Sequence, residues 1–185
     1  MSARVLGLSI AAVCLIADQA HKLWMLFVYD IAARQPVHVA PFLDLVMAWN
    51  PGISYSLFAA ETEAGRWTLL GVTLLVTAGL CVWLWREPDR LIASGLGLIV
   101  GGALGNAYDR YAYGAVADFF HLYVDTERWG RLSWYIFNIA DVAIVAGVGL
   151  LLYQSFFDGS PSGDRKAPAE TPGSSPPNRP DAAAG

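Results

Sequence analysis

The chain has 185 residues, of which 55% are apolar and only 15% are charged. This balance is typical of a membrane protein. The net charge is -4 and no basic stripe stands out, so nucleic-acid binding has little support. Cys14 and Cys81 both fall inside apolar runs, and two such cysteines do not make a disulfide framework.

The first apolar segment is predicted to be a membrane helix over about residues 5–28. Arg4 followed by an apolar run could indicate a cleavable signal peptide, but a polar cluster follows without a convincing cleavage pattern. Within that cluster, Asp18 and Lys22 stand one helical turn apart and can pair on one face. We interpret them as a structural ion pair, with support of a site beyond the helix as the alternative.

The next segment, about residues 30–66, is predicted to be rich in β-structure. Apolar residues alternate loosely with polar ones, and Asn50–Pro51–Gly52 is typical of a turn. The segment is too short and too mixed for another membrane crossing.

Three further spans are expected at about residues 67–85, 91–109 and 134–157. Each run has the length needed to cross a bilayer as a helix. The last run is interrupted only by Asn138 and Asp141. The sequence therefore predicts a bundle of four membrane-spanning helices.

The span at 91–109 carries Gly97, Gly101 and Gly105 at four-residue spacing. Glycines placed in this way let two helix backbones approach closely in lipid. The pattern predicts tight helix packing along this span.

Two segments lie outside the spans. Residues 119–133 mix aromatic with charged side chains, which suits an interfacial loop or a short amphipathic element. Residues 159–185 are rich in Pro, Ser, Gly and Ala, cannot bury a core, and are expected to form a disordered cytoplasmic tail. The chain thus divides into a membrane-embedded domain, residues 1–158, and this tail.

Four spans place both termini on one side of the membrane and the acids near the span ends on the other. Asp18 lies toward the end of the first span, Asp109 and Asp118 follow the third, and Asp141 opens the fourth. Basic residues favour a cytoplasmic assignment for the terminal side. These residues are Arg4, Arg86, Arg90, Arg165 and Lys166.

Two Asn-x-x-Asp pairs stand at span ends, Asn106 with Asp109 and Asn138 with Asp141. An asparagine one turn from an acid can donate a hydrogen bond that orients the carboxylate. Ionisable groups at membrane depth are costly and are therefore functional candidates. Spacing alone nominates Asp109 with Asp141 as a pair that shares one proton and activates water against a peptide bond.

The surroundings of the acids favour a different pair. Asp109 adjoins Arg110, and a nearby cation favours a permanently ionised carboxylate. Asp118 has no adjacent basic residue and is flanked by Ala117 and Phe119. Asp118 is therefore the better candidate for an acid with a raised pKa. No spacing of His, Cys and acidic residues resembles a metal site.

Four motifs occur in order along the chain. They are Asp18–Gln19–Ala20–His21–Lys22, Asn50–Pro51–Gly52, the run from Gly101 through Asn106, Asp109 and Arg110 to Asp118 and Phe119, and Phe137–Asn138–Ile139–Ala140–Asp141. Together they resemble the lipoprotein signal peptidase family (signal peptidase II). The resemblance covers about residues 5–157.

The resemblance implies a membrane all-α fold, a bundle of four transmembrane helices with a small extracytoplasmic β-rich cradle and an interfacial flap at about residues 119–133. It implies a multi-pass aspartyl endopeptidase of the bacterial inner membrane, with its active site toward the periplasm. Such an enzyme removes the signal peptide from prolipoproteins by cleaving just before a cysteine that carries diacylglycerol.

On this resemblance, Asp118 and Asp141 are the catalytic dyad. One carboxylate takes a proton from water, and the other, protonated, stabilises the developing oxyanion. The family's supporting or substrate-binding positions fall on Asp18, Lys22, Asn50, Gly52, Asn106, Asp109, Arg110, Asn138 and Ala140. No cofactor is implied. The implied partners are diacylglyceryl-modified signal peptides and membrane lipid, and the chain is expected to act as a monomer.

Two other classes of protein are alternatives. Buried acids also form ion pathways, as in a small proton-coupled transporter or channel. The absence of evident internal repeats and the clustering of the acids at one face count against that function. A non-catalytic assembly protein whose acids pair with partner helices is the second alternative.

Overall fold

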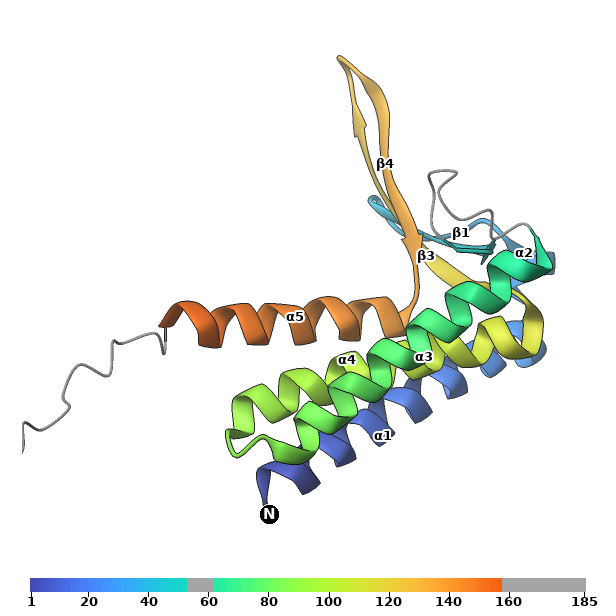
Figure 1. Cartoon of the computed structure of the whole chain (residues 1–185). Coiled ribbons are helices and arrows are strands. Elements are labelled where there is room, and N and C mark those ends of the chain that lie inside the picture. The colour runs from blue at the N-terminus through green and yellow to red at the C-terminus, as the bar shows by residue number, and fades with distance from the viewer. Residues whose placement is uncertain (53–61, 158–185) are drawn as a thin grey trace, which may run out of the picture.

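The computed structural model of the chain describes residues 1–52 and 62–157. Within these ranges, four long helices form a bundle in which α4 contacts the other three (Figure 1). They are α1 (Ala3–Leu23), continued by the π-helical turn η1 (Trp24–Val28), α3 (Glu63–Arg86), α4 (Arg90–Tyr113) and α5 (Ile139–Phe157). Each is long and apolar enough to cross a membrane, α1 together with η1. Four helices that could span a membrane are therefore present, as the sequence predicted, although some of their ends differ.

The glycines of α4 set the distance between helices. A side chain at Gly97, Gly101 or Gly105 would collide with α1, and one at Gly102 would collide with the Ala140 carbonyl oxygen of α5. Such close contacts require residues without a Cβ atom. The tight packing predicted from the glycine spacing is therefore present, and it joins α4 to both α1 and α5.

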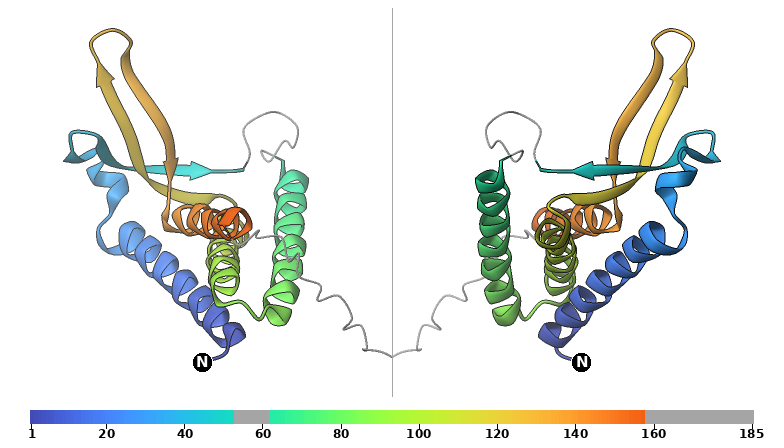
Figure 2. Two further views of the ribbon diagram at one scale, coloured as in Figure 1. Left: turned by 90° about the vertical axis from the view of Figure 1, so that its left-hand side faces the viewer. Right: turned by 90° about the vertical axis from the view of Figure 1, so that its right-hand side faces the viewer.

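A four-stranded antiparallel sheet lies across one end of the bundle (Figure 2). Its strands are β1 (Val37–Ala40), β2 (Leu43–Asn50), β3 (Val116–Thr126) and β4 (Gly130–Phe137), in that order. A short helix, α2 (Ile31–Arg34), precedes β1. Figure 2 also shows that the β3–β4 hairpin projects well beyond the helices.

The helix ends differ from the predicted span ends. Residues 134–137 of the span expected at 134–157 belong to β4, because they pair with β3, and α5 begins only at Ile139. In the other direction, α4 continues beyond residue 109 and ends at Tyr113; the next residue, Gly114, has a φ of 82°, which suits a glycine that terminates a helix.

The sheet also draws on more of the chain than predicted. The described residues of the segment 30–66 supply strands β1 and β2, while residues 119–133, expected as an interfacial loop or flap, belong largely to the β3–β4 hairpin. Antiparallel pairing with β2 extends the sheet into this segment. Residues 53–61 of the expected β-rich segment and the expected tail, 159–185, lie outside the described residues.

Candidate active site

The acids singled out from the sequence lie at the end of the bundle that carries the sheet, away from the N-terminus (Figures 1 and 2). Asp18 and Asp109 are 0% exposed, Asp118 is 2% exposed, and Asp141 is partly exposed. Buried charges need partners, since an unpaired charge inside a protein is strongly destabilising. The contacts of these four side chains therefore decide which acids are held in place and which remain open to chemistry.

Asn138 and Asp141 begin α5 as a reciprocal cap. Asn138 Oδ1 accepts a hydrogen bond from the Asp141 backbone N–H at 3.0 Å, and Asp141 Oδ2 accepts one from the Asn138 backbone N–H at 3.1 Å. This is the arrangement of a capping box, in which two residues satisfy each other's free helix-end donors. We expected the Asn138 side chain to donate to Asp141, but it accepts. The Asn-x-x-Asp spacing places both residues at the start of α5, and the backbone N–H of Asn138 there orients the Asp141 carboxylate.

The amide nitrogen of Asn138 is thereby free to reach the second acid. Asn138 Nδ2 donates to Asp118 Oδ1 at 2.6 Å. One side chain thus caps the helix that carries Asp141 and holds the carboxylate of Asp118. The structure brings Asp118 and Asp141 together through this shared neighbour.

Asn50 holds Asp118 from the side of the sheet. Asn50 Nδ2 donates to Asp118 Oδ2 at 3.1 Å, while Asn50 Oδ1 accepts from the Gly52 backbone N–H at 3.0 Å. The turn requires a φ of 118° at Gly52, a conformation that L-residues with a side chain rarely adopt. Gly52 therefore acts on Asp118 indirectly, by fixing which end of the Asn50 amide faces it.

Burial changes the protonation of Asp118. Loss of solvent raises the pKa of the Asp118 carboxyl from 3.8 to about 6; the charge of Asp141 adds to the rise, and hydrogen bonds from Asn50 and Asn138 oppose it. The direction agrees with the raised pKa expected from its neighbours in the sequence. A carboxyl of this kind can hold or release a proton near neutral pH.

Asn106 joins Asp141 to the first helix. Its Nδ2 donates to Asp141 Oδ1 at 2.9 Å. Its Oδ1 accepts from Lys22 Nζ at 3.2 Å and from Asn138 Nδ2 at 3.1 Å. The sequence suggested that Asn106 orients Asp109, one turn away, but the side chain donates to Asp141. Both ends of the amide are occupied, so its orientation is fixed.

Lys22 is a buried cation with a complete set of partners. Its Nζ lies 2.8 Å from Asp18 Oδ2 and 2.8 Å from Asp109 Oδ2, and its side chain is only 2% exposed. With Asn106 as the third acceptor, all three ammonium donors have a partner. The predicted ion pair of Asp18 with Lys22 is present, and it extends to Asp109.

Asp109 belongs to this ion cluster. Its Oδ2 also accepts from the Ala117 backbone N–H at 3.1 Å, next to Asp118 in the chain. The cation that pairs with Asp109 is Lys22; within residues 1–52 and 62–157, Arg110 forms no ion pair with it. Arg110 donates to the Asn106 carbonyl oxygen at 3.4 Å, and its Nε is buried without a hydrogen-bond partner among the described residues.

Two further groups complete the cluster. The Ala140 backbone N–H donates to Asp18 Oδ1 at 3.0 Å, which ties α5 to α1. Gln19, which the sequence analysis did not single out, places its Nε2 3.1 Å from Asp18 Oδ2 and 3.0 Å from Asp109 Oδ1. Its position between Asp18 and Lys22 in the first motif was the only signal that could have identified it.

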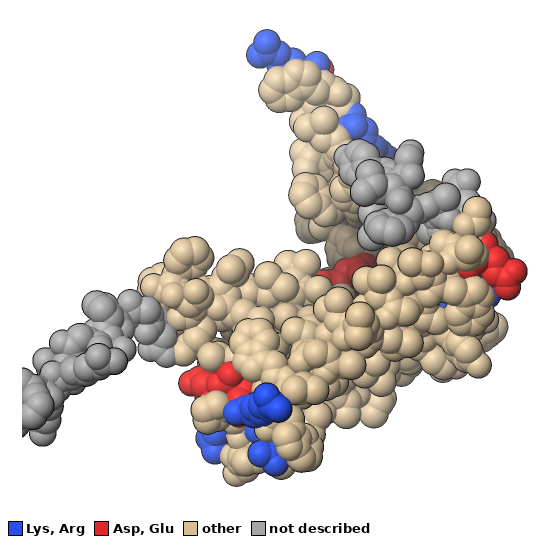
Figure 3. Space-filling view, in the orientation of Figure 1, with Lys and Arg blue, Asp and Glu red and all other residues tan. Residues whose placement is uncertain are grey.

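An apolar groove of about 620 Å³ has Asp141, but not Asp118, among its lining residues. Asp141 and Asn50 line one part of it, and Trp134, Val142 and Val145 are among the apolar residues of its walls. Figure 3 shows acidic atoms in the hollow between the base of the hairpin and the helices. The groove therefore combines a carboxylate with an apolar surface.

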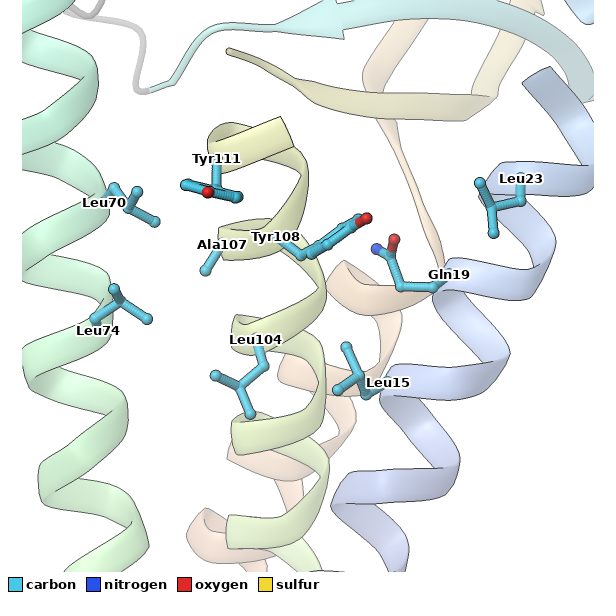
Figure 4. A pocket seen from close by; sticks show the side chains of 9 residues that line it. All are labelled: Leu15, Gln19, Leu23, Leu70, Leu74, Leu104, Ala107, Tyr108 and Tyr111. Carbon is cyan, nitrogen blue, oxygen red and sulfur yellow. The ribbon is translucent and has the colours of Figure 1, made fainter. Parts of the chain in front are cut away.

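A second groove, of about 510 Å³, lies between α1, α3 and α4 (Figure 4). Its lining residues include neither Asp118 nor Asp141. They are Leu15, Gln19, Leu23, Leu70, Leu74, Leu104, Ala107, Tyr108 and Tyr111. This groove provides a comparison for the one that contacts Asp141.

The chain is similar to known proteins over most of its length. The sequence model of the family described as signal peptidase (SPase) II matches residues 10–157. A lipoprotein signal peptidase of Methylocella silvestris is 60% identical over 88% of this chain and 92% of its own length. One of Beijerinckia indica is 55% identical over 84% and 90%.

Solved structures agree in fold. One described as a bacterial membrane enzyme covers 82% of this chain and 93% of its own, with a TM-score of 0.67 and 26% identity. A second bacterial membrane enzyme covers 87% and 93%, with a TM-score of 0.68 and 24% identity. The bundle and its sheet thus form an arrangement known from membrane enzymes.

Proposed function

We propose, since the chain belongs to the signal peptidase II family, that Asp118 and Asp141 are the catalytic pair with which it cleaves its substrates. The chain is a multi-pass membrane peptidase, and its family removes signal peptides from prolipoproteins. Function as a transporter or channel is not supported. The observation that carries the proposal is that Asn138 contacts both acids. Its side chain donates a hydrogen bond to Asp118 and also caps α5, the helix that carries Asp141.

The two carboxyls have different surroundings, which suits them to different roles. Asp141 accepts hydrogen bonds from Asn106 and from the Asn138 backbone at the start of α5, and we assign it the ionised role that takes a proton from water. Asp118, whose pKa is raised to about 6, is assigned the shared proton. That proton stabilises the oxyanion as water attacks the scissile carbonyl, and it then assists departure of the amine.

The substrate is assigned to the groove that contacts Asp141. Its apolar walls suit a signal peptide and a diacylglyceryl group, and its polar end at Asn50 and Asp141 suits the scissile peptide bond. This arrangement supports cleavage just before a lipid-bearing cysteine held near the membrane surface. The hydrogen bonds described for the two acids are made within one chain, and we propose that it acts as a monomer.

We place both termini in the cytoplasm and the active site toward the periplasm of the bacterial inner membrane. The support is the basic residues at the N-terminal end of the bundle, among them Arg4, Arg86 and Arg90. A reporter that is active only in the periplasm, fused at Gly185, should therefore be inactive. Its activity there would reverse the orientation.

The catalytic assignment is tested by Asp118→Asn and Asp141→Asn, assayed with a purified lipidated precursor in bilayers. Each nearly isosteric change should abolish cleavage without unfolding the bundle, because an amide can supply neither the base nor the shared proton. The double variant should be hardly worse than either single one, since both remove parts of one unit. Robust turnover by either folded variant would refute the mechanism. Equal cleavage of lipidated and unlipidated precursors would refute the lipid requirement.

A further inference from the structure

The outer part of the β3–β4 hairpin has one apolar face. Side chains alternate along a strand, so Asp118, Leu122 and Val124 share one face of β3. Leu132 lies opposite Val124 in β4. Trp134 follows at the point where the pairing with β3 is irregular, and it lines the same groove as Leu122. The strand face that carries Asp118 at its base therefore continues outward as Leu122, Val124, Leu132 and Trp134, which we call the apolar face.

The other face of the hairpin carries Asp125 and Arg131, which pair with each other across the strands. Asp125 Oδ1 lies 2.8 Å from Arg131 Nε across the two strands. The Arg131 guanidinium lies 4.0 Å from the centre of the Tyr123 ring, and the Tyr123 hydroxyl donates to the buried Asp44 at 3.2 Å. These contacts anchor the charged face to β2 and leave the apolar face turned away from them.

The apolar face is uncovered by the described residues, 1–52 and 62–157. Val124 is 58% exposed, Leu132 51% and Trp134 70%. A continuous apolar surface of this kind marks a contact with another molecule or with lipid. The direction of the hairpin and the surface that adjoins it distinguish these possibilities.

The hairpin rises from the start of α5 and extends across the direction of the helices (Figure 1). Its charged atoms lie at the tip and along the edge turned away from α5, while the edge toward α5 is uncharged (Figure 3). Trp134 lines the same groove as Val142 and Val145, which are 53% and 71% exposed on a membrane-spanning helix. The apolar face is therefore continuous with a lipid-facing surface of α5.

From this continuity we propose that the apolar face of the hairpin rests on the bilayer, on the leaflet at the sheet end of the bundle. Tryptophan is favoured at the level of the lipid headgroups, where its apolar ring is buried and its N–H stays wet. The groove at Asp141 then opens directly onto lipid, so a substrate with a lipid anchor can enter without leaving the membrane.

Two neighbouring positions provide a matched test. Leu132 lies on the apolar face and Ser133 on the opposite one, and both are exposed. After Cys14 and Cys81 are replaced by alanine, a single cysteine at Leu132 or Ser133 is labelled with a nitroxide, and the protein is placed in nanodiscs of phosphatidylethanolamine and phosphatidylglycerol. Collisions with oxygen report contact with lipid, and collisions with a charged nickel chelate report contact with water. Unchanged unfolding of both labelled proteins serves as the folding control.

The Leu132 label should collide with nickel several-fold less often than the Ser133 label, and with oxygen several-fold more often. Equal, water-like values at both positions would overturn the proposal. Protection at Leu132 that vanishes when each nanodisc holds one copy would assign the face to a second copy of the chain, and would also overturn it. The measurement needs no substrate, so it is independent of the proposed catalytic mechanism.

Discussion

Replacing Asn138 by serine and by alanine separates the helix cap made by this side chain from its contact with Asp118. Its Oδ1 accepts from the Asp141 backbone N–H at 3.0 Å and caps α5, while its Nδ2 donates to Asp118 at 2.6 Å. Serine keeps an oxygen that can cap the helix but is too short to reach Asp118 as well. Alanine removes both contacts. The two variants therefore differ in the cap and share the loss of the donor.

Each contact has an expected magnitude. Loss of a helix cap costs about 1 kcal/mol, so Asn138→Ala should unfold more easily than Asn138→Ser by about that amount. Because Asp118 is assigned the proton, the bond from Asn138 joins two neutral groups and is worth about 0.5–1.5 kcal/mol. If it holds Asp118 in the reactive geometry, kcat should fall roughly 2- to 13-fold, and by a similar factor in both variants.

The assays are cleavage of a lipidated precursor in nanodiscs and unfolding in mixed detergent micelles. Asn138→Ser that cleaves as fast as wild type would show that the donor to Asp118 is not needed for catalysis. Equal stability of the serine and alanine variants would show that the cap contributes nothing to α5.

Four further outcomes are expected. Lys22→Met should lower the free energy of unfolding by about 3–5 kcal/mol, because it leaves two buried carboxylates unpaired. Arg131→Met, which breaks an equally short but exposed ion pair, should lower it far less, and equal losses would contradict the importance of burial. The raised pKa of Asp118 predicts that kcat/KM falls as pH rises through about 6, and a profile that stays flat well above this value would contradict its role as proton holder. The same shift means that stability contributed by Asp118 is present below 3.8 and is lost as pH rises toward about 6, which unfolding of wild type against Asp118→Asn would measure. Val145→Trp should slow cleavage by obstructing the groove at Asp141, while Leu74→Trp, in the groove without an acid, should leave cleavage unchanged; the reverse order would assign the substrate to the other groove.

The sequence predicted the helices well because their apolar runs match the thickness of a bilayer. It misplaced the start of α5, since Trp134, Tyr135, Ile136 and Phe137 precede the apolar residues of the helix with only the polar Asn138 between them. A short apolar stretch is compatible with either a strand or a helix. Here the pairing with β3 makes residues 134–137 part of a strand. The polar Asn138 was the available signal for the boundary, because asparagine is a favoured helix cap.

The sequence predicted which residues form the candidate site more accurately than it predicted which of them contact each other. Asp118 was favoured over Asp109 because Asp109 adjoins Arg110, yet the cation that pairs with Asp109 is Lys22, from another helix. Likewise, Asn106 donates to Asp141 and not to the acid one turn away. Local spacing identifies residues that share a helix face, but contacts between helices depend on how closely the helices pack.

That packing links the glycines of α4 to the polar network. Gly97 and Gly101 bring the backbone of α1 against α4, and at the next step of the same spacing a side chain on Gly105 would occupy the place of the Asp18 carboxylate. Because α1 lies this close, Lys22, one turn beyond Asp18, reaches across to α4 as an ion pair of 2.8 Å. The same lysine fixes the asparagine amide that donates to Asp141. The spacing that permits close packing of the helices in lipid thus also determines where the carboxylate of the proposed dyad points.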